Sequence, residues 1–193
     1  MPEAPLRIAV ITGSTREGRF GPIPARWIAA RVDERPDMLV DPIDLAHAGL
    51  RPIHPQALDP DEQLYVERIG RADGFVVVTP EYNHAYPAGL KHAIDLPRDE
   101  WRQKPVAFVS YGGLAGGLRA VEQLRLVFAE LHATTVRDTV SFHNFYGCFD
   151  DAGQPLDRTG TTAAATTMLD QLAWWATALR TAREHDQFAG EAA

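Results

Sequence analysis

The stretch that decides the fold is LRIAVITGSTR, residues 6–16. Its apolar, β-branched first part predicts a buried strand over 6–12, and the Gly-Ser-Thr-Arg that follows predicts a loop. Beyond the loop, Trp27, Ile28 and Val32 recur at helical spacing and predict a helix over 24–34. A strand, a polar loop and a helix in this order are typical of the first unit of a parallel α/β sheet.

The alternation of strand and helix continues along the chain. Asp59-Pro60-Asp61-Glu62 combines an N-cap, a proline at the first helical position and a glutamate at the third, which predicts a helix start. Residues 74–79, GFVVVT, form a continuous apolar run of the kind that is buried on both faces of a sheet. The other predicted strands cover 39–45, 106–110 and 134–140, and the predicted helices cover 60–72, 87–96, 118–131 and 161–183.

Five strands alternating with five helices predict an α/β fold with a doubly wound, five-stranded parallel sheet covered by helices on both faces. We expect a threonine to cap the closing helix. The apolar stripe of that helix comprises Met168, Leu172, Trp175 and Leu179. We expect residues 1–193 to form one domain, with a core over about 6–184 and a frayed tail over 185–193.

Composition narrows the class of protein. A net charge of −7 with only two lysines, Lys91 and Lys104, argues against nucleic acid as a partner. No stretch approaches the ~20 apolar residues that span a bilayer, so we expect no membrane association. The N-terminus has no secretory pattern and the single cysteine, Cys148, cannot form an internal disulfide, which together favour the cytoplasm.

Ligands of doubly wound sheets bind beyond the carboxyl ends of the strands, where the strand order reverses, so the loops after the first, third and fourth strands should form the site. In the first loop, Ser14 and Thr15 can donate hydrogen bonds and Arg16 can neutralise a phosphate at a helix N-terminus. An ordinary strand-to-helix turn is the alternative. Arg19-Phe20 stands where a P-loop needs lysine followed by serine or threonine. This sequence therefore excludes a P-loop nucleoside triphosphatase.

The other two loops suit a planar ring. Pro80 fixes the backbone of the loop over 79–87, so that its polar groups are held ready for a heteroaromatic edge. Glu81 as an acid or base and His84 as a proton relay are weaker hypotheses than a solvated or structural role. Four glycines within 112–117 let the backbone pass close to a ring, and they fit no G-x-G-x-x-G register, so the NAD-binding fingerprint is absent.

Three motifs together resemble the NADPH-dependent FMN reductase family: GSTR at 13–16, PEYNHAYPAGLKHAID at 80–95 and SYGGLAGGLRA at 110–120. The resemblance extends over about 8–131 and implies a flavodoxin-like fold with strand order 2-1-3-4-5. It implies FMN as cofactor, and NADPH or NADH as the co-substrate that reduces it. It also implies a small electron acceptor, such as a flavin, quinone, azo compound or metal oxyanion, and a homodimer or homotetramer.

The resemblance implies three groups of flavin contacts. Those at the phosphate are Ser14, Thr15, Arg16, Phe20, Gly21, Pro22 and Ile23; those along the isoalloxazine are Pro80, Glu81, Tyr82 and Asn83; and those on the pyrimidine side are Tyr111, Gly112 and Gly113. Ala85 replaces a serine of many relatives, and we expect no catalytic role there. No nucleophile–base pair or cysteine pair accompanies the loops, so no catalytic side chain is predicted and the cofactor carries the chemistry.

Three further points concern a metal site, the aromatic segment and the class of function. His47 and His54 lack the neighbours that would complete a ligand set, and no metal is predicted. The aromatic segment over 142–149 either covers the site, meets a partner subunit or packs on its own sheet. A non-enzymatic flavodoxin-like electron carrier or flavin-binding module is the alternative function, and the arginine in the first loop together with the moderate charge favours the enzyme.

Overall fold

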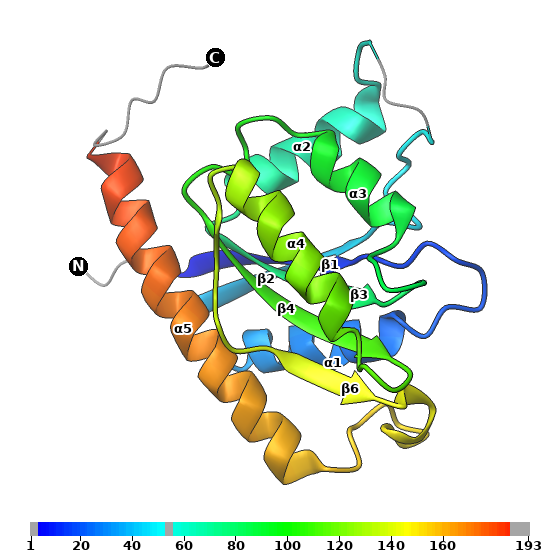
Figure 1. Cartoon of the computed structure of the whole chain (residues 1–193). Coiled ribbons are helices and arrows are strands. Elements are labelled where there is room, and N and C mark those ends of the chain that lie inside the picture. Colours follow the sequence, from blue (N-terminus) through cyan, green and yellow to red (C-terminus); the bar gives the residue numbers. More distant parts are fainter. Residues whose placement is uncertain (1–3, 53–55, 186–193) are drawn as a thin grey trace.

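The computed structural model describes residues 4–52 and 56–185. His54 and the predicted tail beyond residue 185 lie outside the described residues. The sheet is parallel, and its order β2-β1-β3-β4-β5 confirms the predicted doubly wound topology (Figure 1). Its four long strands are β1 (Leu6–Thr12), β2 (Met38–Asp44), β3 (Gly74–Pro80) and β4 (Pro105–Gly112).

The centre of the sheet follows from hydrophobicity. Every residue of β3 and of β4 is buried, as expected for strands covered on both faces. β1 pairs with β2 on one side and with β3 on the other, so the strand order reverses between β1 and β3. Pro42 is tolerated in β2 because that strand forms the edge of the sheet.

The predicted fifth strand over 134–140 is wrong in its bounds. Two short segments, β5 (Thr134–Thr135) and β6 (Val140–His143), pair in parallel with different parts of β4. Between them the Arg125 guanidinium donates hydrogen bonds to the Val136 and Arg137 carbonyl oxygens, at 2.8 and 3.0 Å. A side chain thereby takes carbonyl groups that a continuous ladder would have used.

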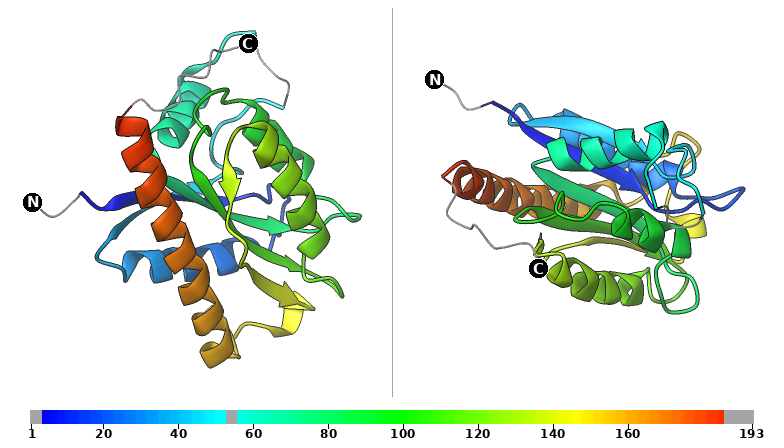
Figure 2. Two further views of the ribbon diagram at one scale, coloured as in Figure 1. Left: turned by 60° about the vertical axis from the view of Figure 1, so that its left-hand side comes forward. Right: turned by 90° about the horizontal axis from the view of Figure 1, so that it is seen from above.

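Helices cover both faces of the sheet (Figures 1 and 2). One core cluster joins the sheet to α1 (Pro22–Asp33) and α5 (Arg158–Glu184). The other joins the sheet to α2 (Pro60–Arg71), α3 (Ala88–Asp95) and α4 (Leu118–Glu130). No helix in the described part of the chain is both long and apolar enough to span a membrane.

Capping explains where two helices begin. The predicted capping box of α2 is present, since Asp59 accepts from the Glu62 N–H while the Glu62 carboxylate accepts from the Asp59 N–H. The threonine cap expected for α5 is wrong: Asp157 caps it by accepting from the Gly160 N–H at 2.9 Å, so the helix starts at Arg158.

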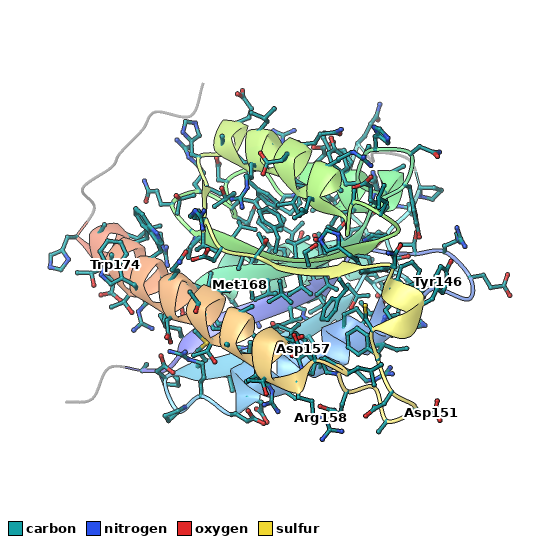
Figure 3. All side chains as sticks on the ribbon, turned by 60° about the horizontal axis from the view of Figure 1, so that its bottom comes forward. Tyr146, Asp151, Asp157, Arg158, Met168 and Trp174 are labelled. Atoms are coloured by element: carbon teal, nitrogen blue, oxygen red, sulfur yellow. The ribbon has the colours of Figure 1, made fainter. Side chains whose placement is uncertain are left out.

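The apolar stripe of α5 is partly corrected. Met168 and Leu172 are fully buried, whereas Trp175 is 37% exposed and Trp174 is 65% exposed. The small Ala176 is buried instead, as part of the core cluster that joins α5 to the sheet. In Figure 3 Trp174 stands near one end of α5, far from Tyr146.

The amino ends of the strands carry a polar cluster around Asp73, which directly precedes β3. The Asp73 carboxylate accepts from the Arg7 N–H at 2.9 Å and pairs with Arg183 at 3.3 Å and with Arg180 at 3.6 Å. The cluster therefore ties the last turns of α5 to β1 and β3.

Lys104 is buried in the same region. Its Nζ donates to the carbonyl oxygens of Ile69 and Gly70, at 3.0 and 2.7 Å, near the end of α2. Burial, with Arg183 nearby, lowers the pKa of Lys104 to about 8.

Candidate functional site

A cleft with a volume of about 470 Å³ lies where the loops after β1, β3 and β4 meet. It is at the carboxyl ends of the strands, beside the point where the strand order reverses, as predicted. Its size is that of a small-molecule site. The lining residues are Arg16, Gly18, Arg19, Phe20, Ile23, Pro80, Glu81, Tyr82, Tyr111, Gly112, Gly113, Phe145 and Tyr146.

Two arginines from the loop after β1 reach the cleft. The Arg16 guanidinium carbon lies 5.7 Å from the centre of the Tyr82 ring, within cation–π range. Arg19 has a side chain that is 14% exposed and donates to the Asp44 carboxylate at 2.5 Å. The cleft is therefore lined by one exposed guanidinium, that of Arg16, and one that is held by an ion pair, that of Arg19.

Helix α1 contributes less to an anion site than its position suggests. Pro22 and Pro24 have no N–H group, and the Ile23 N–H donates to the Phe20 carbonyl oxygen at 3.0 Å. The first turn of the helix therefore offers its dipole but no unused donor. Backbone donors for a phosphate would have to come from the loop over 15–20.

The loop after β3 makes a tight turn beside the cleft. The Tyr82 and Ala85 N–H groups donate to each other's carbonyl oxygens, at 2.8 and 3.1 Å. Asn83 and His84 between them both have positive φ, at 51° and 68°, which is the geometry of a type I′ turn. The Tyr82 hydroxyl also hydrogen-bonds to Ser14 Oγ at 2.9 Å, so the loops after β1 and β3 are directly joined.

Glu81 is occupied by a structural contact. Its side chain is only 9% exposed, and it accepts from the Arg119 guanidinium at 2.8 Å and from the Arg119 backbone N–H at 3.2 Å. Both donors belong to the first turn of α4. This geometry favours the structural role over the acid–base hypothesis for Glu81.

The end of β4 and the loop that follows it place an aromatic ring and bare backbone at the cleft. The Tyr111 ring lies 5.6 Å from the Phe20 ring and 5.4 Å from the Phe145 ring. An added Cβ at Gly112 would lie 2.9 Å from the Gly117 nitrogen, whereas one at Gly113 would meet nothing within 4 Å. Gly112 is thus required by packing, and Gly113 leaves open space beside the cleft.

Two buried donors indicate that the cleft is built for a ligand with acceptor oxygens. The Tyr111 hydroxyl and the Arg19 Nε are each buried and have no hydrogen-bond partner among the described residues. Burial raises the pKa of the Tyr111 phenol far above its usual value, and the neighbouring Ser14 side chain opposes part of that rise. Unpartnered buried donors are costly, and a bound phosphate or polyol chain would satisfy them. The residues present therefore fit FMN.

Most of the predicted flavin contacts line the cleft, and five of them do not: Ser14, Thr15, Gly21, Pro22 and Asn83. Ser14 is fully buried beneath Tyr82, Thr15 packs beside Gly89, and Asn83 is exposed at the tip of its turn. Gly21 is buried against Tyr111, because an added Cβ there would lie 2.8 Å from the hydroxyl. Pro22 serves the start of α1.

Four lining residues are absent from the predicted contacts: Gly18, Arg19, Phe145 and Tyr146. The charge of Arg19, within the predicted loop, was the signal that could have included it. Phe145 begins the short 3₁₀ helix η1 (Phe145–Gly147), which the Asn144 N–H fixes by donating to the Gly113 carbonyl oxygen at 2.9 Å. Tyr146 is 86% exposed, and Figure 3 shows it projecting from this turn.

The aromatic segment over 142–149 has two roles. Phe142 packs 5.8 Å from Trp27 and 4.6 Å from Phe149, so this part lies on its own sheet. Phe145 lies 4.6 Å from Phe20 and lines the cleft. The covering and packing interpretations of the segment therefore each describe a part of it. Among the residues that the structure describes, no group of three histidine, cysteine or acidic side chains could hold a metal ion.

The chain is similar in sequence to known flavin and quinone reductases. An NAD(P)H-dependent FMN reductase of Schizosaccharomyces pombe is 38% identical over 122 residues, which cover 58% of this chain and 60% of the relative's own length. A 2-hydroxy-1,4-benzoquinone reductase of a Burkholderia species is 29% identical, and the match covers 88% of this chain and 96% of the relative.

A solved structure is also similar. The flavoenzyme NAD(P)H:(acceptor) oxidoreductase of Paracoccus denitrificans superposes with a TM-score of 0.72 at 20% identity, covering 90% of this chain and 98% of that one. Residues 6–147 match the model of the NADPH-dependent FMN reductases. This chain, with its flavodoxin-like fold, belongs to the NADPH-dependent FMN reductase family.

Proposed function

We propose that this chain binds FMN in the cleft and uses NAD(P)H to reduce it, passing the electrons to a small acceptor. The observation that carries the proposal is the pair of unpartnered buried donors, Tyr111 Oη and Arg19 Nε, on residues that line a single cleft. The oxygen-rich side chain of FMN supplies acceptors for both.

The residues divide the work of holding the cofactor. Arg16 and Arg19 neutralise the phosphate, with donors from the backbone over 15–20. The turn at Tyr82 offers fixed polar backbone to the ring, and Gly113 allows the ring to approach the chain closely. The bound flavin supplies the hydride and electron transfer.

Phe145 and Tyr146 line one side of the cleft with aromatic rings. Their rings are 4.0 Å apart at an angle of 31°, and Phe145 is held by Phe20. An apolar wall at this place keeps water away from the ring and favours flat aromatic molecules. We infer a quinone as the preferred acceptor, and the activity named for the Burkholderia relative supports this.

The proposal extends to the setting of the enzyme. It acts as a single flavodoxin-like domain in the cytoplasm, as a homodimer or homotetramer, without nucleic acid or membrane partners. The net charge of −7 argues against nucleic-acid partners, and the single cysteine supports the cytoplasmic location. Light scattering of the purified protein measures the assembly.

The test is to purify the protein, add FMN, remove the excess and measure bound flavin, then follow NADPH and NADH oxidation with flavin, quinone, azo and metal-oxyanion acceptors. Bound flavin and turnover with both a nicotinamide and a quinone support the enzyme. A colourless protein with no affinity for FMN contradicts it. Tight flavin binding without nicotinamide oxidation, together with reductive titration in separate one-electron steps, supports the carrier instead.

A further inference from the structure

Helix α4 begins without a cap of its own. Its N-cap residue is Gly117, at φ = 85°, which provides no side-chain acceptor, and its first turn contains no acidic residue. The positive end of a helix dipole normally attracts an acceptor or a carboxylate. Glu81, from a loop 38 residues earlier, supplies one to the Arg119 N–H at 3.2 Å.

The same carboxylate also pairs with the Arg119 side chain at 2.8 Å. The Arg119 side chain is 47% exposed, but that of Glu81 is 9% exposed, so the pair is partly shielded from solvent. Glu81 is at the same time a lining residue of the cleft, and its N–H donates to the Tyr111 carbonyl oxygen at 3.2 Å. Glu81 therefore lines the cleft while its carboxylate contacts the first turn of α4.

One turn further along α4, a second contact holds the same loop. Gln123 Nε2 donates to the His84 carbonyl oxygen at 2.8 Å. His84 has a positive φ of 68°, a conformation that is unfavourable for a residue with a Cβ. The contact from Gln123 therefore adds to the two backbone hydrogen bonds that close this turn.

We propose that Glu81 is a positioning residue, which holds the flavin-binding turn over 82–85 in place by capping helix α4 through Arg119. The inference rests on the proposed function. It goes beyond that function because it assigns the Glu81 carboxylate to the alignment of two loops, and not to proton transfer or to cofactor contact.

The test compares Glu81→Ala and Glu81→Gln with Glu122→Ala, a control that removes an exposed α4 carboxylate paired to Arg125 at 3.3 Å. We expect Glu81→Ala to raise the Kd for FMN about tenfold, the size expected when a helix cap and an ion pair are lost together. Glu81→Gln keeps an acceptor for the Arg119 N–H, and should restore most of the affinity. The control should bind FMN like the parent protein.

Two further measurements separate positioning from other roles. At saturating FMN, kcat and its pH profile should be unchanged in Glu81→Gln, whereas loss of kcat would make Glu81 a proton-transfer group and overturn the inference. In the flavin-free protein, amide hydrogen exchange at Tyr82, Ala85 and Arg119 should be faster in Glu81→Ala than in Glu122→Ala.

The two proposals fail in different ways. If the parent protein binds no FMN, the proposed function fails, while the exchange measurement still tests the link between Glu81 and the turn. If Glu81→Ala exchanges like the control, or binds FMN with the parent affinity, the positioning role is wrong even in an active flavoenzyme.

Discussion

The hydroxyl of Tyr111 fits against the bare Cα of Gly21, so closely that a methyl group on Gly21 would lie 2.8 Å from the phenolic oxygen. Tyr111 is near the carboxyl end of β4, and Gly21 is the N-cap of α1, in the segment after β1. Their contact sets how closely the end of β4 and the start of α1 approach each other at the base of the cleft. Gly21 has a φ of −45°, so the contact, and not the backbone conformation, excludes a side chain there.

Gly21→Ala should therefore lower the free energy of unfolding by about 1–3 kcal/mol through overpacking. Adding Tyr111→Phe should recover part of that loss, because it removes the atom that clashes. Urea unfolding of the two single variants and the double variant measures the coupling. Additive effects would show that the clash is relieved elsewhere.

Tyr111→Phe alone should act in opposite directions on stability and binding. Removing an unpartnered buried hydroxyl should leave the flavin-free protein as stable as the parent, or more stable by about 1 kcal/mol. Loss of its hydrogen bond to the cofactor should weaken FMN binding by about 0.5–1.5 kcal/mol. Calorimetry and flavin titration on the same preparation test both; unchanged affinity would mean that the hydroxyl does not contact FMN.

Gly113→Val should block the cofactor without harming the fold, because the space beside Gly113 is open. Gly117→Ala is the contrast: at φ = 85°, with an added Cβ 2.8 Å from that of Ser110, it should cost about 2–4 kcal/mol of stability. Thermal unfolding and FMN titration of both variants give the answer. Normal flavin affinity in Gly113→Val would place the ring elsewhere.

Arg16→Ala should weaken FMN binding by about 1–3 kcal/mol, the range for a charge-assisted hydrogen bond. The effect should shrink as salt is added, since Arg16 is exposed. Arg26→Ala, which removes an exposed arginine on α1, is the matched control and should bind FMN normally. Equal losses in the two variants would indicate only a long-range effect of net charge.

Lys104 should make stability rise with pH. Its pKa is about 8 in the fold against 10.5 for a free lysine, so between these values the unfolded chain binds more protons and folding is favoured as pH increases. From pH 7.5 to 9.5 the parent should gain about 1–2 kcal/mol that Lys104→Met does not. Lys91→Met, the same change at an exposed ion pair, should retain the gain.

Two buried tyrosines limit the pH range over which stability should rise. Burial raises the pKa of Tyr65 and of Tyr111, so above about pH 10 the unfolded chain loses protons that the fold keeps, and stability falls. The comparison by urea unfolding therefore belongs below pH 10. Parallel pH curves for the parent and Lys104→Met would contradict the lowered pKa.

The centre of the sheet was predictable because local pattern and tertiary burial agree there. The run over 74–79 is apolar throughout, and the structure buries every residue of β3. The fifth strand was not predictable, because its interruption depends on Arg125, which reaches across from α4. No property of the segment over 136–139 alone reports that contact.

The site shows the same division. The loops after β1, β3 and β4 follow from topology, and so does their convergence. Phe145 enters the cleft because a backbone hydrogen bond from Asn144 to Gly113 fixes the turn that carries it. The Glu81–Arg119 contact spans 38 residues, and either side chain alone resembles an ordinary surface charge. A contact between residues so far apart in the sequence becomes visible only when the fold brings them together.

The Asp73 cluster has a practical consequence for protein engineering. It fastens the end of α5 at the amino edge of the sheet, while every loop that shapes the cleft lies at the carboxyl edge. Substitutions that strengthen the cluster would add thermal tolerance at a distance from the chemistry. Mutant libraries at Tyr146, made to change the electron acceptor, would then start from a more stable protein. Such a protein tolerates useful substitutions that lower its stability.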